Sequence, residues 1–190
     1  MKHDIVLAGV GGQGVLSVSA VIARAALDCG LQVKQSEVHG MAQRGGAVLA
    51  HLRLSDDRIW SDLIPSGSAA LLVSMEPLES LRYLDLLAPD AEVVTAIEPV
   101  ANLADYPPLE QVLAAVRRLP RHALIDADRI AKAAGSARAV NMVMVGAASR
   151  FLPVAEPALE KAIARSFERK GRAVVDQNLA AFHGGRAAAA

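Results

Sequence analysis

The stretch Asp4-Ile-Val-Leu-Ala-Gly-Val-Gly-Gly-Gln-Gly14 decides how this chain begins to fold. Apolar residues run directly into glycine, and an apolar-periodic segment follows the last glycine. This pattern predicts a buried strand, a tight turn and the start of a helix. Glycine lets the backbone bend sharply and approach a neighbour or a ligand closely, and the N–H groups that open a helix attract anions. The corner is therefore a candidate anion site.

The glycines Gly9, Gly11 and Gly14 match the Gly-x-Gly-x-x-Gly pattern of dinucleotide-binding turns. They also match the first half of a phosphate loop, but Val15 and Leu16 stand where that loop needs Lys and Ser or Thr, which argues against an NTPase. A dinucleotide fold further needs an acidic side chain where the second strand ends, and this chain has Lys-Gln-Ser there, with a glutamate one position later. Close helix–strand packing and anion binding both stay open as the reason for the glycines.

Composition narrows the class of protein. The 190 residues are 53% hydrophobic and 21% charged, which is typical of a globular chain, and the formal net charge of zero argues against a nucleic-acid binder. We expect a single domain over residues 1–186 and a frayed tail at 187–190. The one cysteine, Cys29, excludes an intrachain disulfide and a cluster held by several thiolates of this chain. No apolar run is long enough to span a membrane, and the immediate first strand leaves no room for a signal peptide, so we expect a cytoplasmic protein.

The order of the remaining elements follows from periodicity and breakers. A helix from Gln13 to Asp28 should lead to a strand at 31–36, parallel to the first strand through a right-handed crossover. The segment 36–46 is polar and glycine-rich, and we expect it to be an ordered functional loop. Alternation over 47–54 predicts a half-buried strand, with residues 58–62 as the second arm of a hairpin. We expect further strands at 69–74, 92–95 and 122–126. Further helices are expected to start at Pro77, to span 109–119, to follow the strand at 122–126 and end near residue 134, to span 140–151 and 157–170, and to start at Arg172.

The middle loop contains the second group of candidate site residues, Gln43-Arg44-Gly45-Gly46. An arginine fork suits phosphate or carboxylate recognition, but Arg44 is expected to pin the loop or grip a partner subunit rather than to touch a ligand. The residues His39, His51, Cys29 and Glu37 match no metal-ligand spacing, and His51 should point outward from its strand. No nucleophile with a nearby base is recognisable, so we expect no catalytic residue and no metal site in this chain.

Three motifs resemble the gamma-type domain of the 2-oxoacid:ferredoxin oxidoreductase family. They are Gly9-Val-Gly-Gly-Gln-Gly14, Gln35-Ser-Glu-Val-His-Gly-Met-Ala-Gln-Arg-Gly-Gly46 and Val140-Asn-Met-Val-Met-Val-Gly146. Residues 157–182 are similar to the helical end of the family. The Ser-Glu-Val-His-Gly-Met form of the middle loop is most similar to the indolepyruvate branch, where the corresponding chain is the beta subunit. The resemblance implies an α/β fold with a central, mainly parallel sheet, helices, a Rossmann-reminiscent first β-α-β unit and an added antiparallel hairpin layer.

The resemblance also implies a function. The chain would be a subunit, inactive alone, of an enzyme that oxidatively decarboxylates aryl pyruvates to acyl-CoA and passes electrons to ferredoxin. Thiamine diphosphate and 4Fe-4S clusters are expected in a larger alpha subunit, and coenzyme A is the expected co-substrate. A free-standing dinucleotide-binding module or regulator is the alternative. The candidate cofactor-binding residues are Gly9, Gly11, Gly12, Gln13, Gly14, Gln43, Arg44, Gly45 and Gly46.

Overall fold

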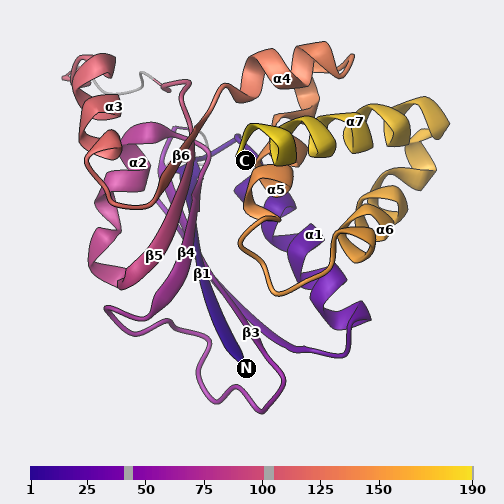
Figure 1. The fold of residues 1–190 in the computed structure, drawn as a ribbon, viewed down its shortest axis with the longest axis horizontal. Helices are drawn as coiled ribbons and strands as arrows, with labels where there is room; N and C mark the ends of the chain where they lie inside the picture. Colours follow the sequence, from indigo (N-terminus) through magenta and orange to yellow (C-terminus); the bar gives the residue numbers. More distant parts are fainter. Residues whose placement is uncertain (41–44, 101–104, 190) are drawn as a thin grey trace.

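The computed structural model describes residues 1–40, 45–100 and 105–189. This part of the chain forms one six-stranded sheet, in the order β2-β3-β1-β4-β5-β6, with helices packed against it (Figure 1). The strands are β1 (Lys2–Val10), β2 (Gln32–His39), β3 (Ala47–Ser55), β4 (Ala69–Ser74), β5 (Leu87–Ala96) and β6 (His122–Ile125). The helices are α1 (Val15–Asp28), α2 (Pro77–Arg82), α3 (Leu109–Arg117), α4 (Ala127–Ala133), α5 (Val140–Ala148), α6 (Glu156–Phe167) and α7 (Arg172–Ala188), with short 3-10 turns η1 (Leu84–Leu86), η2 (Ala137–Ala139) and η3 (Glu168–Lys170).

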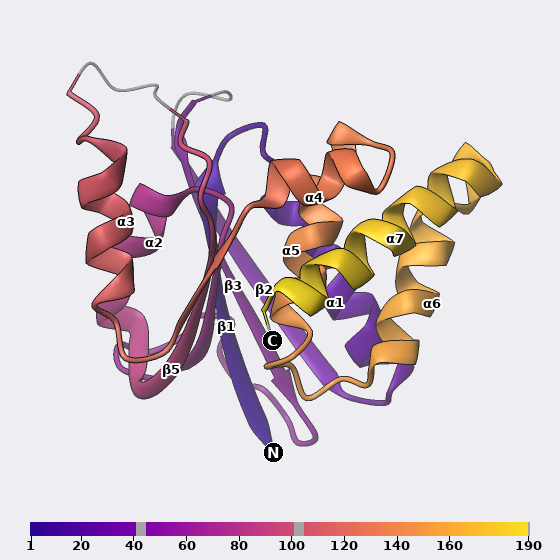
Figure 2. The ribbon, with the colours of Figure 1, turned by 45° about the horizontal axis from the view of Figure 1, so that its top comes forward.

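The sheet separates two helical layers (Figure 2). Helices α2 and α3 cover one face, and α1 together with α4 to α7 covers the other (Figures 1 and 2). Strands β1, β4, β5 and β6 are parallel to one another, whereas β3 runs antiparallel to both β1 and β2. This arrangement confirms the expected α/β class with a mainly parallel sheet and an antiparallel hairpin.

The position of the hairpin differs from the expectation. Strand β2 does not pair with β1, because β3 lies between them and pairs with both. The hairpin therefore joins β2 to β3, and β2 continues to His39, inside the segment that we expected to be loop. The expected second arm, residues 58–62, is not a strand. It belongs to an irregular segment, residues 56–68, whose backbone is bonded to side chains of β3.

Two polar residues of β3 hold this segment in place. Arg53 makes a two-point ion pair with Asp4 on β1 (Nε–Oδ1 2.8 Å, Nη2–Oδ2 3.1 Å) and donates through Nη1 to the carbonyls of Ser61 and Leu63. His51 Nδ1 accepts a hydrogen bond of 2.9 Å from the backbone N–H of Ile64. His51 is only 7% exposed and Arg53 only 6%. His51 faces away from the main core, as its alternation predicts, but it does not reach solvent, because segment 56–68 covers this face of the strand.

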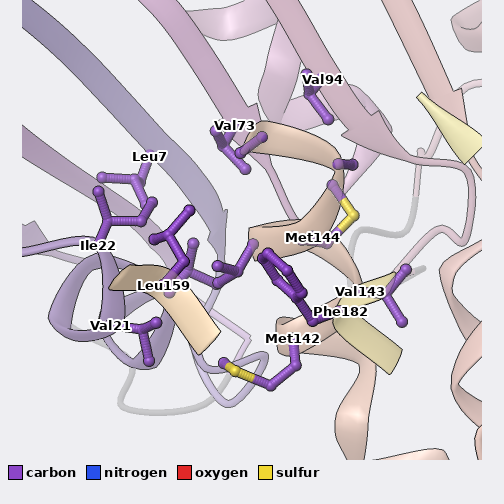
Figure 3. Close-up of a cluster of buried hydrophobic side chains, with 14 of the residues drawn as sticks. Leu7, Val21, Ile22, Val73, Val94, Met142, Val143, Met144, Leu159 and Phe182 are labelled. Atoms are coloured by element: carbon purple, nitrogen blue, oxygen red, sulfur yellow. The ribbon is translucent and has the colours of Figure 1, made fainter. Parts of the chain in front are cut away.

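The main core lies between the sheet and the larger helical layer. Figure 3 shows side chains of β1, α1, α5, α6 and α7 meeting there, among them Leu7, Ile22, Leu159 and Phe182. The run Met142–Ala148 is buried completely, as its apolar sequence predicts. Helices α5 and α7 pack backbone to backbone at two glycines, Gly146 on α5 and Gly185 on α7. A Cβ on Gly146 would lie 1.9 Å from the carbonyl oxygen of Phe182.

Candidate functional site

The glycine turn lies at a change in the direction of winding. Strands β1 and β4 are parallel neighbours, and the helices that follow them, α1 and α2, lie on opposite faces of the sheet (Figure 2). At such a topological switch point the two connections diverge, and the crevice at the carboxyl ends of the strands is where open α/β sheets bind ligands. The sequence-predicted corner at residues 9–14 therefore occupies the position that the topology favours for a site.

Gln13 ties the two strands together at this point. Its Oε1 accepts a hydrogen bond of 2.8 Å from the backbone N–H of Val10, and its Nε2 donates to the carbonyl of Met75 at 2.9 Å. The backbone N–H of Met75 in turn donates to the carbonyl of Ala8 at 2.9 Å. Both ends of the Gln13 amide are thus used by the protein's own backbone, so this side chain shapes the turn.

Each glycine of the turn occupies its position for a different physical reason. Gly9 is there for packing, since a Cβ would lie 2.8 Å from Val15 Cγ2 and 3.1 Å from Met75 Cβ. Gly12 is exposed, has φ +103°, and a Cβ there would meet nothing within 4 Å. Gly14 begins α1 with φ +81°. No side chain caps α1, and its first turn has no acidic residue, so the positive end of this helix faces the open side of the turn.

The two groups of candidate residues meet through their backbones. The N–H of Gly11 donates to the carbonyl of Gly46 at 2.8 Å, and the N–H of Gly45 donates to the carbonyl of Gly11 at 3.3 Å. The glycine turn and the end of the middle loop therefore form one continuous rim. Gln43 and Arg44 lie outside the described residues, so their expected roles stay predictions.

The crevice itself has a volume of about 410 Å³ and extends from Gly12 and Gly14 to residues of the later helices. Asp128 from α4, Arg138 from η2 and Asn141 from α5 line it. Among the described residues, the lining of this crevice includes no His, Cys, Ser, Thr or Lys, so that part of the chain offers no nucleophile paired with a base there. The arrangement is suited to binding a ligand.

Asn141 is the polar group of the crevice that most needs a partner. Its Oδ1 is buried and accepts no hydrogen bond from the described chain, and its Nδ2 lies 3.2 Å from where a Cβ of Gly14 would stand. Buried acceptors without a donor are uncommon in native proteins, so a ligand or water donor is expected there. Sequence reasoning missed this residue, although Asn141 is the single polar side chain in the apolar run 140–146.

A second cleft, of about 590 Å³, shares Asn141 and Arg138 with the first and continues along α1 and α7. Ser17, Lys170 and Gln177 line its walls. Neither Arg138 nor Lys170 makes an ion pair within the described chain, and Lys170 Nζ lies 5.3 Å from the ring centroid of Phe167, in a cation–π contact. The combined groove is thus bordered by an uncapped helix start and two cations that form no ion pair in the described chain, against the one carboxylate of Asp128, which favours an elongated anionic ligand.

Two acidic residues near the crevice, Glu76 and Glu98, serve the fold. Glu76, at the carboxyl end of β4, is 1% exposed and caps α2 by accepting from the N–H of Glu79 at 2.8 Å. Its other oxygen accepts from the hydroxyl of Tyr106. Burial raises the pKa of Glu98, whose Oε1 accepts from the N–H of Asp128 at 2.9 Å. These carboxyl groups are engaged with backbone or phenol donors.

Fold and crevice together define an α/β protein with a cleft at the topological switch point of its sheet, whose lining in the described residues has no nucleophile paired with a base. The chain belongs to the pyruvate ferredoxin/flavodoxin oxidoreductase family, whose model matches residues 4–188. It is accordingly a subunit of a 2-oxoacid:ferredoxin oxidoreductase, which confirms the resemblance drawn from the three motifs.

Individual relatives support this assignment. The chain is 39% identical to the indolepyruvate oxidoreductase subunit IorB of Archaeoglobus fulgidus, over 96% of this chain and 92% of that protein. Its fold is similar to pyruvate oxidoreductase subunit PORC of Thermotoga maritima, with TM-score 0.76, 25% identity and coverage of 98% and 96%. It is also similar to the 2-oxoglutarate:ferredoxin oxidoreductase of Magnetococcus marinus (TM-score 0.79, 25% identity), a structure with 2-oxoglutarate, coenzyme A and succinyl-CoA bound. This similarity covers 99% of the present chain and 31% of the M. marinus chain.

Proposed function

We propose that this chain is the subunit without thiamine and without clusters in an oxidoreductase that acts on indolepyruvate or a similar aryl pyruvate. The enzyme would convert the 2-oxoacid to an acyl-CoA and pass the electrons to ferredoxin. Support comes from the near full-length similarity to the indolepyruvate subunit of A. fulgidus. The chain has one cysteine, whereas a 4Fe-4S cluster needs four ligands, so the clusters would belong to the larger alpha subunit together with thiamine diphosphate.

The crevice would contribute to the binding of coenzyme A. The observation that carries this proposal is the open, positively polarised turn at Gly12, next to Arg138 and to the unpartnered Oδ1 of Asn141. Coenzyme A is a long molecule with several phosphates, and it is present in the M. marinus structure. Its phosphates suit the helix start and the guanidinium, and its amide or ribose groups can donate to Asn141.

The alternative of a free-standing dinucleotide-binding module is disfavoured by the strand order. In a dinucleotide fold the second strand lies beside the first and presents its acidic residue to the ribose bound at the glycine turn. Here β3 occupies that place, and β2 lies one strand further away.

No helix in the described chain has the combined length and apolarity needed to cross a bilayer. We place the complex in the cytoplasm and treat residues 1–186 as one domain.

Purification of the tagged chain from its native cells tests the subunit assignment. The expected companion is a larger chain with several Cys-x-x-Cys groups and bound thiamine diphosphate. The reconstituted pair should reduce ferredoxin with indolepyruvate and coenzyme A, and the lone chain should not. Turnover by the lone chain, or a partner without thiamine, would contradict the proposal. Saturable binding of NAD(P) by the lone chain would instead favour the dinucleotide module.

Matched substitutions test the coenzyme A site in the reconstituted enzyme. Gly12→Leu places a side chain in the mouth of the crevice, and Gly30→Leu is its control, because Gly30 has a similar positive φ (81°) and equally open surroundings. Both carry the same backbone strain, about 1–2 kcal/mol. Only Gly12→Leu should raise the KM for coenzyme A, by tenfold or more. Equal KM values in the two variants would remove the crevice from the reaction.

A further inference from the structure

Three metal-ligating side chains meet where α6 and α7 pack together. Glu156 and Glu160 lie one helical turn apart on α6, and His183 on α7 reaches both of them. The Nε2 atom of His183 lies 3.1 Å from Glu160 Oε1, and its Nδ1 lies 3.5 Å from Glu156 Oε1. One ligand atom of each residue falls within 4.8 Å of the other two. This cluster belongs neither to the crevice nor to the core.

Arg186 organises one side of the cluster. Its Nε donates to Glu156 Oε2 at 2.8 Å, and its Nη1 donates to Ser149 Oγ at 2.7 Å. The guanidinium is thereby fixed between α5 and α6, and it engages one oxygen of Glu156 while the other oxygen faces His183. Metal ligands are commonly oriented in this way by hydrogen bonds from a second group.

With the imidazole of His183 neutral, the protein leaves the charges of the cluster unbalanced. Two carboxylates face one guanidinium and one imidazole, and a neutral imidazole has only one N–H for two acceptor oxygens. Its other nitrogen then presents a lone pair toward a carboxylate, which is repulsive. A divalent cation placed between the three side chains would replace that repulsion by coordination and would compensate the remaining negative charge.

We propose that Glu156, Glu160 and His183 form a binding site for a divalent transition-metal ion, with Zn²⁺ as the best match. Carboxylate oxygen and imidazole nitrogen are both zinc ligands, and three protein ligands with a remaining water position are a common zinc arrangement. The separation of 3.1 Å between Nε2 and the Glu160 oxygen is close to the edge of a tetrahedron with bonds of about 2.0 Å. The side chains are 35–50% exposed, so the ion would exchange with solvent.

The ion would act as a clip between the two last helices. Helix α6 packs against α1, and α7 packs against α5 and carries Gln177 of the groove. A metal ion that binds the native state and not the unfolded chain raises the free energy of unfolding by mass action. The sequence gives little warning of the site, because His183 lies far along the chain from the two glutamates and joins them only when the helices pack.

Titration of the full-length chain with Zn²⁺ at neutral pH tests the proposal by calorimetry. All proteins carry Cys29→Ser, because the exposed thiol would itself take zinc. We expect one saturable site and a rise in melting temperature with added Zn²⁺. Substitution with Co²⁺ should give the visible absorption of a low-coordinate site.

Variants assign the site to these residues. His183→Gln and Glu160→Gln should each weaken zinc binding at least tenfold, whereas Glu168→Gln, an exposed glutamate of η3 outside the cluster, should not change it. Circular dichroism checks that each variant is folded. Absence of saturable binding to the parent chain would overturn the proposal and leave the cluster as an ion-pair clasp. Equal binding by His183→Gln would also overturn it.

Discussion

The close contact between α5 and α7 gives a sharp prediction for Gly146→Ala. The new Cβ would stand 1.9 Å from the carbonyl oxygen of Phe182, 2.8 Å from its carbonyl carbon and 2.9 Å from the backbone nitrogen of Arg186. Carbon and oxygen approach each other to about 3.3 Å at the closest, so the backbones must separate by about 1.4 Å. Backbone atoms of a helix cannot rotate away as a side chain can.

The cost follows from the core that this movement opens. Phe182 is completely buried beside Met142 and Val143 (Figure 3), so a shift of α7 breaks contacts along the whole interface. Overpacking costs about 1–3 kcal/mol or more, against a gain of about 1 kcal/mol in helix propensity. We expect Gly146→Ala to lower the free energy of unfolding by about 2 kcal/mol or more, or to prevent folding.

Urea denaturation followed by circular dichroism measures this effect. Gly184→Ala is the control in α7, because its Cβ would meet only a side-chain methyl, Ile130 Cγ2, at 2.6 Å. That methyl can move, so we expect a change within about 1 kcal/mol. If Gly146→Ala unfolds within about 0.5 kcal/mol of the parent and with the same m-value, the helices are not in the contact described.

Three further predictions concern the sheet. Asp4→Asn leaves the buried guanidinium of Arg53 without its counter-ion, and it should lower the free energy of unfolding, measured with urea, by about 3 kcal/mol. A loss below about 1 kcal/mol would show that the ion pair does not anchor segment 56–68. Burial and the Arg53 charge lower the pKa of His51 from its ordinary 6.5. Its stabilisation is therefore present above that value and is lost as the pH falls below it, since the unfolded chain then binds more protons. His51→Gln should make the melting temperature depend less steeply on pH between 7 and 5, and an unchanged slope would contradict this. The similar contribution of His3, whose pKa burial lowers, and the opposite contributions of Glu79 and Glu98, whose pKa burial raises, remain in the variant. Gln13→Ala should cost about 2 kcal/mol and raise the KM for coenzyme A, whereas a variant that changes neither would show that the turn keeps its shape without the amide.

The sequence by itself determined the features that depend on neighbours along the chain. Strand β4 has the expected bounds, α1 begins directly after the glycine turn, and α5 is buried. Each of these follows from periodicity, a breaker or a proline within a few residues. The motif at residues 9–14 also predicted the strand, turn and helix that form this corner, because the three are consecutive in the chain.

Tertiary structure alone decided what depends on distant segments. Strand β3 lies between β1 and β2 in the sheet. This order depends on the pairing energies between strands, which the local alternation of residues cannot reveal. The burial of His51 and Arg53 depends on segment 56–68, of which residues 58–62 were expected to be a second strand. Arg138 and Asn141 join the glycine turn only because α5 packs beside α1. A site assembled across more than a hundred residues has no local period or spacing, so it becomes visible only when the chain has folded.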